Sequence, residues 1–431
     1  MIIDFTVENY RSIKNAVTLS AVAQSREKAA SQRTRRSVRP DSEIAPTYSV
    51  EGRNLELLPV LGIFGANASG KTNVIRALDD LLQFMTMGAG ESRGLRMLSK
   101  FVPFKLNKST SVLPTRFELR VVHVNTIFTY TLLVNQARIL KERLEYIPPP
   151  PHRKISRLLF ERLWESESNK HVWKNGTEWG NTYIQIQESL QDHAPFMSFL
   201  TINLKVELLQ EFTRWLRNRW PGLTLGYEDY DYWVATQILG DVRKERRKNV
   251  EKMVKAFDTG ISKIKIEKVD SEGADGGAEF KVLVEHQTDG KPISWPLEDE
   301  STGTQRLFSL AYKTLDALHL GGLMLVDELG SNIHPLITKT IVRIFQRLDT
   351  NPNRGQLIFT SHDNTLQRGL LRRDQIWFTQ KQKGGSTDLY PLSDFRPRND
   401  LAVDKAYLDG RFGGVPIAPA EEELILLSGI E

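Results

Sequence analysis

The chain of 431 residues contains no cysteine, which excludes disulfide bonds, thiolate metal ligands and a thiol nucleophile. No apolar run approaches the roughly 20 residues of a membrane helix. The N-terminus has an early acid, Asp4, and lacks the long apolar segment of a signal peptide. The sequence also has no internal repeat and no long heptad pattern, so a long coiled coil is not expected. These absences predict a soluble, cytoplasmic protein without membrane contact.

Charged residues are plentiful and of both signs: 58 Lys and Arg stand against 53 Asp and Glu, for a formal net charge of +5. A mildly basic chain can contact nucleic acid, but an ordinary solvated surface gives the same balance. Two basic clusters, residues 25–40 and Arg243–Lys248, leave the same alternatives open. Each is either a solvated surface or a contact for an acidic partner. Composition alone therefore leaves the class of partner undecided.

One phosphate-binding pattern is complete. Gly65-Ala-Asn-Ala-Ser-Gly-Lys-Thr72, here called the P-loop, follows the apolar run Val60–Phe64 and opens a segment with helical spacing, Lys71–Met87. Its glycines allow backbone N–H groups to surround phosphates, and the start of the helix adds positive potential. Lys71 is expected to neutralise the β- and γ-phosphates, and the Thr72 hydroxyl to bind Mg²⁺. The pattern predicts ATP and Mg²⁺ as cofactors.

Two further strands end in polar residues. The buried run Leu323–Val326 delivers Asp327 and Glu328, which need a reason to lie there because burying unpaired charge is costly. Beside a P-loop, Asp327 is expected next to Mg²⁺, and Glu328 on the other side of the strand, where it can activate the attacking water. Gln356–Thr360 precedes His362, which can sense the γ-phosphate and hold that water.

A second helix start lies before this acidic pair. Ser301-Thr-Gly-Thr-Gln305, here called the signature segment, opens a segment with helical spacing, and Ser301 is expected to cap it. Its small residues would expose backbone amides to an anion. An ordinary N-cap gives the same pattern, so this segment alone does not establish a second phosphate contact.

The order of elements predicts an α/β fold in three stretches. We expect residues 1–150 to form the N-terminal part of an ATPase core with an antiparallel side sheet, because Pro114–Ile147 is rich in β-branched and aromatic residues. The prolines at 148–151 then mark a lobe boundary. Residues 151–262 are expected to form a mainly helical insertion lobe, and residues 263–431 to return to strands and complete the core.

Taken together, these motifs resemble the ABC-type ATPases of the RecF and SMC class. Leu329–Pro335, which follows the acidic pair, corresponds to their D-loop, and Asn9-Tyr-Arg-Ser12 is similar to their N-terminal motif. The resemblance implies an ABC-type P-loop head that closes as a homodimer, or a higher homo-oligomer, around ATP. It implies nucleotide contacts from Arg11, Asn67, Ala68, Ser69, Gly70, Lys71, Thr72 and Asn73 of one protomer and from Ser301, Gly303 and Gln305 of its partner. It places Thr72 and Asp327 at the metal, and gives catalytic roles to Lys71, Glu328 and His362.

The sequence resembles more specifically the bacterial AbiLi and RloA group, which includes the AriA subunit of the PARIS anti-phage system. This resemblance rests on five sequence segments: Phe5–Ile13, Asn67–Asn73, Val102–Leu106, Asp327–Pro335 and Ala406–Gly414. This resemblance implies a sensor and scaffold ATPase that holds a separate toxic effector, such as a Toprim nuclease, until an acidic phage factor triggers release. The alternative is a RecF-like repair ATPase that binds DNA directly.

The sequence departs from the transporter ATPases of this class. Its signature reads Ser-Thr-Gly-Thr-Gln, and Phe101–Lys105 occupies the region where a Q-loop glutamine would supply a second Mg²⁺ ligand. A transporter motor is therefore the weakest of the three functions. The clustered acids of a Toprim domain are absent after His362, so we expect no nuclease chemistry within this chain.

Overall fold

The computed structural model describes residues 1–24, 47–88, 91–152, 155–177, 183–202, 207–218, 223–224, 244–257, 260–269, 279–398 and 401–415. The basic cluster at residues 25–40 lies outside the described residues, as does Arg243 of the second cluster. Within the part of the chain that is described, no helix combines the length and apolar character needed to cross a membrane.

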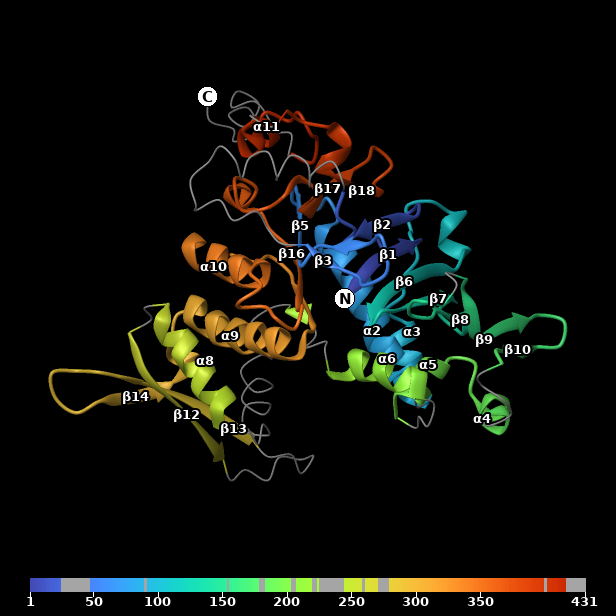
Figure 1. Ribbon diagram of the computed structural model, residues 1–431, viewed down its shortest axis with the longest axis horizontal. Helices are drawn as coiled ribbons and strands as arrows, with labels where there is room; N and C mark the ends of the chain where they lie inside the picture. The colour runs from blue at the N-terminus through green and yellow to red at the C-terminus, as the bar shows by residue number, and fades with distance from the viewer. Residues whose placement is uncertain are drawn as a thin grey trace, which may run out of the picture.

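A six-stranded sheet forms the centre of the molecule, in the order β11-β15-β16-β5-β17-β18 (Figure 1). All its pairs are parallel except that of β17 with β18. Strands β5, β15 and β16 are buried along their whole length, as strands covered on both faces should be. The six strands are Leu223–Thr224, Leu323–Val326, Gln356–Thr360, Val60–Gly65, Ile376–Lys381 and Thr387–Pro391.

This sheet separates two hydrophobic cores, since alternate side chains of a strand point to opposite faces. Leu61 and Ile63 of β5 join the core that contains α2, Lys71–Met87. Val60 and Phe64 join the core that contains α10, Pro335–Gln346. The predicted P-loop therefore begins at the end of a strand fixed from both sides.

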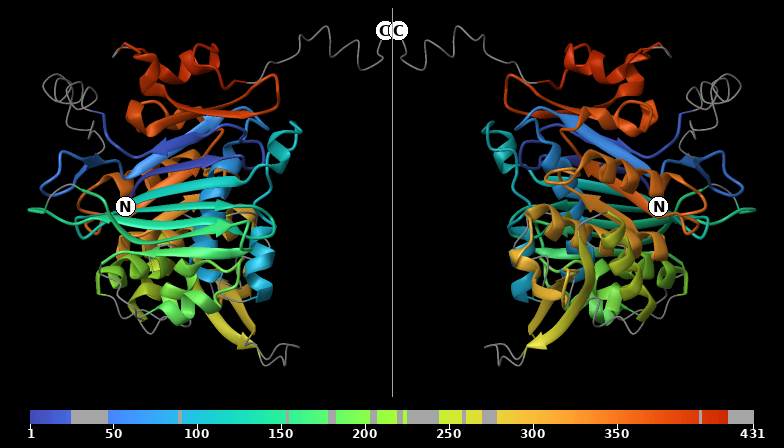
Figure 2. Two further views of the ribbon diagram at one scale, coloured as in Figure 1. Left: turned by 90° about the vertical axis from the view of Figure 1, so that its right-hand side faces the viewer. Right: turned by 90° about the vertical axis from the view of Figure 1, so that its left-hand side faces the viewer.

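A seven-stranded antiparallel side sheet packs against the first core, in the order β10-β9-β8-β7-β6-β1-β2 (Figure 2). Three of its strands confirm the predicted antiparallel sheet of Pro114–Ile147: β6 Thr115–His123, β7 Thr126–Val134 and β8 Ile139–Ile147. β1, Ile2–Glu8, and β2, Val17–Ser20, extend this sheet beside β6.

The sheet continues beyond the expected boundary at residue 150. β9, Arg157–Glu165, pairs with β8, and β10, Lys170–Asn175, pairs with β9. Burying Leu159 and Phe160 of β9 extends the same core, and pairing satisfies the backbone edge that β8 would otherwise expose. The prolines thus interrupt a sheet between two of its strands, and the structure differs here from the expected start of a helical lobe.

The described helices of residues 151–262 lie in two places. Those before residue 219 pack in the first core with α2 and α3, Glu91–Leu98; they are α4 Ile184–Ser189, α5 Phe196–Ile202 and α6 Glu207–Asn218. α8, Lys244–Ala256, lies apart from them and packs against a three-stranded sheet, as Figure 1 shows. The expected single insertion is therefore divided between two cores.

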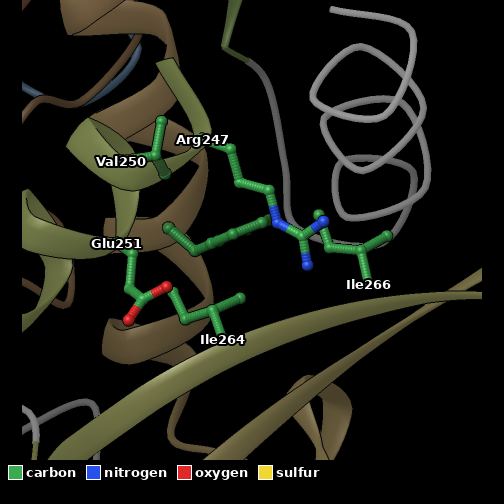
Figure 3. Close-up of a pocket in the computed structure, with 6 residues that line it drawn as sticks. Arg247, Val250, Glu251, Ile264 and Ile266 are labelled. Carbon is green, nitrogen blue, oxygen red and sulfur yellow. The ribbon is translucent and has the colours of Figure 1, made fainter. Parts of the chain in front are cut away.

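This second group, here called the signature lobe, contains α8, the sheet β12-β13-β14 and the start of α9. The expected return to strands after residue 263 is present, but β12, β13 and β14 form a sheet of their own, separate from the central sheet. A small pocket between α8, β12 and α9 is lined by Val250, Ile264, Ile266 and Phe308, with Arg247 and Glu251 at its side (Figure 3). The elements are β12 Ile261–Val269, β13 Glu279–His286, β14 Ile293–Pro296 and α9 Thr302–Leu320.

The segment Ala406–Gly414, near the C-terminus, packs against β17. Tyr407, in α11 (Val403–Leu408), stacks on Phe378 with ring centroids 5.0 Å apart, and Phe412 stacks on the same ring at 5.9 Å. The Tyr407 hydroxyl donates to the carbonyl of Gly414 and closes the turn. This segment thereby stabilises a central strand next to β5. A two-stranded ribbon of β3, Tyr48–Ser49, and β4, Glu56–Leu57, completes the described elements.

Candidate nucleotide-binding site

The P-loop connects β5 to α2 with a backbone shaped for an anion. Ala68 and Gly70 adopt left-handed conformations, with φ of 59° and 105°. A Cβ at Gly70 would collide with the Thr387 hydroxyl, so only glycine fits there. Gly70 caps α2 without a side-chain hydrogen bond, so no capping side chain competes with phosphate at the start of this helix. Asn67 and Ala68 lie exposed at the tip of the loop.

Hydroxyl groups from distant segments fix the P-loop. The Ser69 hydroxyl lies 2.7 Å from that of Thr379, and the Thr387 hydroxyl donates to the Ser69 carbonyl at 2.8 Å. Ser12 lies 2.8 Å from Thr387 and accepts from the Asn73 amide at 2.7 Å. In this structure the side chains of Ser69 and Asn73 are therefore hydrogen-bonded to other segments of the protein. Sequence analysis missed Thr379 and Thr387, because nothing local marks them.

Lys71 is folded over the loop that contains it. Its ammonium donates to the carbonyls of Gly65 at 2.9 Å and Ala66 at 3.0 Å. Burial lowers the pKa of Lys71 to about 8, and the charges of Glu328 and Asp327 oppose that shift. The ammonium form still predominates at neutral pH. A cation in this position is suited to phosphate oxygens, which would replace the two carbonyls as its acceptors.

The two predicted metal ligands meet at the ends of neighbouring elements. The Thr72 hydroxyl donates to Asp327 Oδ1 at 3.1 Å, and the Thr360 hydroxyl donates to the same oxygen at 2.6 Å. One carboxylate and one hydroxyl fit a Mg²⁺ site that is completed by phosphate and water. No group of three His, Cys, Asp or Glu within the described residues forms a protein-only metal cage. Thr72 and Asp327 therefore fit magnesium bound together with a nucleotide.

Glu328 and His362 lie beside this pair. Glu328 Oε1 is 3.9 Å from His362 Nε2, and both side chains are about half exposed. Burial and the charge of Lys71 lower the pKa of His362 below its usual value, so the ring is neutral at pH 7. The strand-alternation argument for Glu328 was wrong: β15 ends at Val326, and Glu328 is in a left-handed turn with φ of 54°. Its N–H donates to the Thr360 hydroxyl at 2.7 Å.

The signature segment is built as predicted at its start and is fixed by the chain around it. The Ser301 hydroxyl accepts from the N–H of Thr304 at 3.1 Å, which confirms the N-cap. The Gln305 amide donates to the carbonyls of Glu298 and Glu300. A Cβ at Gly303 would lie 2.5 Å from the Asn332 carbonyl oxygen, so the D-loop packs closely against the segment.

Arg306 connects the signature segment to the acidic pair. Its guanidinium donates to the main-chain carbonyls of Asp327 and Glu328. Ser301 and Thr302, by contrast, are exposed at the start of α9, and the Ser301 hydroxyl bonds within its own turn. The segment is thus close to the turn that carries the acids, while its serine faces outward.

The N-terminal motif braces α2. Tyr10 donates to Asp80 of α2 at 2.6 Å, and Arg11 Nε donates to the Tyr10 hydroxyl at 3.0 Å. The N–H of Arg11 also bonds to the carbonyl of Val102, at 2.7 Å. Phe101–Lys105, found where a Q-loop would be expected, thus lies beside Arg11. The structure places Arg11 beside Tyr10, which bonds to α2 at Asp80; the contact of Arg11 with the nucleotide stays a prediction.

Comparisons with known proteins give a family match. A family model described as "AAA domain, putative AbiEii toxin, Type IV TA system" matches residues 60–179 and 206–367, which contain the P-loop, the signature segment, the acidic pair and His362. No curated protein matches the chain.

Two solved structures are similar at low identity. One is described as the crystal structure of the SmcHead bound to the C-winged helix domain of ScpA, with a TM-score of 0.45, 12% identity, and 94% of this chain and 99% of that chain covered. The other is the SMC head domain from Thermotoga maritima, with a TM-score of 0.39, 10% identity, and 90% and 98% covered. On the family match, which spans more than half of the sequence, the chain belongs to the AAA_21 family of P-loop ATPases.

Proposed function

We propose that this P-loop ATPase hydrolyses ATP at composite sites, each completed by the signature segment of a second copy. Lys71 binds the phosphates, Thr72 and Asp327 hold Mg²⁺, and Glu328 accepts a proton from the attacking water. Neutral His362 holds that water and senses the γ-phosphate. Mg²⁺ supplies charge neutralisation of the phosphates when bound. These five residues act within one chain.

A single observation carries the cis half of the proposal. One oxygen of Asp327 accepts hydrogen bonds from Thr72, at the start of α2, and from Thr360, at the end of β16. The strands β5, β15 and β16 are neighbours in one parallel sheet, so their carboxyl ends bring phosphate-binding and acidic residues together. A Lys, a hydroxyl, two acids and a His around one sheet edge support phosphoryl transfer to water better than any other reaction class.

The exposed helix start supports the trans half. Ser301 caps a 19-residue helix and faces outward, which suits a phosphate presented by another molecule. In a two-fold dimer each signature segment would meet the other chain's P-loop, as an isologous interface requires. ATP would then close the dimer, and hydrolysis would release it.

Mixing two inactive variants tests this arrangement. Lys71→Ala and Ser301→Arg should each abolish turnover, whereas their heterodimer retains one site with an intact P-loop and an intact signature. Equimolar mixing should therefore restore roughly a quarter of the wild-type rate, since about half of the dimers are mixed and each has one intact site. Ser294→Arg, an exposed serine on the same lobe, should leave turnover unchanged. Turnover by Ser301→Arg alone would refute the trans role.

Glu328→Gln tests the general base and dimer closure together. The variant should bind ATP, turn over about 10²- to 10⁴-fold more slowly, and accumulate as an ATP-dependent dimer in analytical ultracentrifugation. Wild-type turnover in Glu328→Gln would remove Glu328 as the base. A monomer with ATP bound would count against closure.

For the biological task, we propose a sensor and scaffold ATPase of anti-phage defence that holds a separate toxic effector. Membership of a family described by a toxin and a type IV toxin–antitoxin system supports this role. Copurification of a toxic partner encoded next to this chain, with release on infection and loss of protection in Lys71→Ala, would test it. Salt-sensitive DNA binding that stimulates turnover without such a partner would favour the DNA-repair alternative.

A further inference from the structure

Glu300, the residue before the signature serine, is held by two aromatic side chains. Its Oε1 accepts from the Trp295 indole N–H at 2.8 Å and lies 2.6 Å from His286 Nε2. The His286 and Trp295 rings stack at 4.1 Å with an angle of 8° between their planes. The Glu300 and His286 side chains are only 11% and 18% exposed. One carboxylate oxygen therefore fixes the loop to the ends of β13 and β14.

The main chain of the same residue supports the signature segment. The Glu300 carbonyl accepts from the Gln305 amide at 2.9 Å, and its N–H donates to the Leu297 carbonyl at 3.1 Å. Ser301 follows directly with φ of −58° and ψ of 147°, the extended conformation that an N-cap needs. Glu300 is thus bonded through its side chain to the signature-lobe sheet and through its backbone to the start of α9.

We propose that Glu300 is a positioning residue for hydrolysis, which sets the direction in which Ser301 and the first turn of α9 meet the partner's phosphate. This inference rests on the composite site proposed above. Hydrogen bonds to a mostly buried carboxylate are among the stronger ones in proteins, and four partners on one residue leave little freedom. Small displacements of a group at a reacting centre lower the reaction rate strongly, so a loop fixed in this way is suited to presenting phosphate ligands.

The structure also distinguishes this role from general stabilisation. The core of the signature lobe is built mainly from apolar side chains of α8, β12, β13 and α9; Trp295 packs against this core, whereas the polar side chains of Glu300 and His286 are not part of it. Removing the Glu300 carboxylate should therefore leave that core intact and free only the loop. We therefore expect removal of this carboxylate to affect the step in which two chains close on ATP.

The test compares Glu300→Ala, Glu300→Gln and Trp295→Phe with Asp299→Ala, which removes the exposed neighbouring carboxylate. Glu300→Ala should lower kcat about 10- to 100-fold, while the Kd of a fluorescent ATP analogue for the isolated protomer and the Tm stay near wild type. In a Glu328→Gln background it should also weaken the ATP-dependent dimer. Glu300→Gln keeps an acceptor for Trp295 and should recover most of kcat, Trp295→Phe should fall between, and Asp299→Ala should match wild type.

Unchanged kcat in Glu300→Ala would overturn the inference. So would parallel losses of kcat, protomer ATP affinity and Tm, because they would indicate damage to the fold. If Glu300→Ala does not express as folded protein, Trp295→Phe decides on the same readouts. Ser301→Arg separates the two proposals: activity in Ser301→Arg refutes the composite site itself, whereas an inactive Ser301→Arg with a fully active Glu300→Ala refutes only the positioning role.

Discussion

Thr360 carries more of the site than its plain side chain indicates. Its hydroxyl donates to Asp327 Oδ1 and accepts from the N–H of Glu328, so one group orients a proposed metal ligand and the backbone of the proposed base. The residue is fully buried at the end of β16. Partners of metal ligands are often needed as much as the ligands themselves.

Replacing that hydroxyl should weaken the metal site. Thr360→Val keeps the shape of the side chain but leaves Asp327 without its shorter hydrogen bond, so we expect the apparent affinity for Mg²⁺ or the rate of hydrolysis to fall about 10- to 100-fold. Titration of ATPase activity with Mg²⁺ measures both. Thr360→Ser retains the hydroxyl and should stay close to wild type. Equal activity in the valine and serine variants would show that the hydroxyl is dispensable.

Sequence analysis found the residues of this site that belong to continuous patterns. Lys71, Thr72, Asp327 and His362 follow buried strands at regular places, and the structure brings them to one sheet edge. It did not find Thr379, which reaches the P-loop across 310 positions. Such a contact depends on the order of strands in the sheet, which no local pattern contains.

At the level of elements, α9, which begins in the signature segment, packs closely against the backbone of the D-loop. The Asn332 carbonyl occupies the space where a side chain at Gly303 would be. Since Arg306, one turn further along α9, bonds to the carbonyls of Asp327 and Glu328, the helix and the acidic turn are joined at two points. The relative position of the signature segment and the acids is therefore fixed within each protomer.

Adding one carbon atom at this contact should disturb it. Gly303→Ala places Cβ 2.5 Å from a backbone oxygen, so α9 or the D-loop must shift. We expect turnover to fall about tenfold or more, although alanine is the better helix former. Gly290→Ala, in a turn with open space around its Cβ position, is the matched control. A Gly303→Ala variant that is more stable and fully active would contradict the packing argument.

Strands and helices were predictable where their periodicity was regular, as in β6, β7 and α2. The division into lobes was not. β9 comes after the four prolines at 148–151 and a short polar segment. It still pairs with β8, because any strand that returns to the edge of a sheet can satisfy the unpaired backbone N–H and C=O groups there. α8 and β12 are adjacent in sequence and share one core. The boundary expected at residue 262, which was drawn from composition, separates these two elements.

Over the whole molecule, α9 contributes side chains to two hydrophobic cores and interacts with a helix of the third. Phe308 and Tyr312 belong to the core of the signature lobe, and Leu310 and Ala317 to the core around α10. Lys313 of the same helix is buried and interacts electrostatically with Asp79 of α2, the helix that follows the P-loop. One helix thus joins the signature segment to both sides of the central sheet.

The buried Lys313 predicts a pH dependence of stability. Burial lowers its pKa to about 7, against the attraction of Asp79, while the unfolded chain binds that proton up to about pH 10.5. Between these values the unfolded state holds more protons, so the contribution of Lys313 to stability rises with pH. The Tm of wild type minus that of Lys313→Met should therefore increase between pH 7 and pH 9. A difference that stays flat would indicate that Lys313 keeps its proton in the folded protein over this pH range, as a charged and paired lysine does.

An exposed lysine provides the control for this measurement. Lys255→Met removes a cation from the surface of α8, where it pairs with Glu251 four residues earlier. Exposed pairs of this kind contribute little to stability, so its Tm difference should not follow the same rise. Differential scanning fluorimetry over the pH range compares the three proteins directly.

The left-handed turn at Glu328 has a cost that the protein retains. A residue with a side chain pays about 1–2 kcal/mol for this conformation, which glycine adopts freely. Selection for thermal stability alone would therefore favour glycine where the proposed base lies. If Glu328 is the base, stability and turnover conflict at this turn, and libraries screened only for heat resistance should lose its carboxylate. An unfavourable backbone conformation retained beside a phosphate-binding loop is in itself a reason to propose a functional role there.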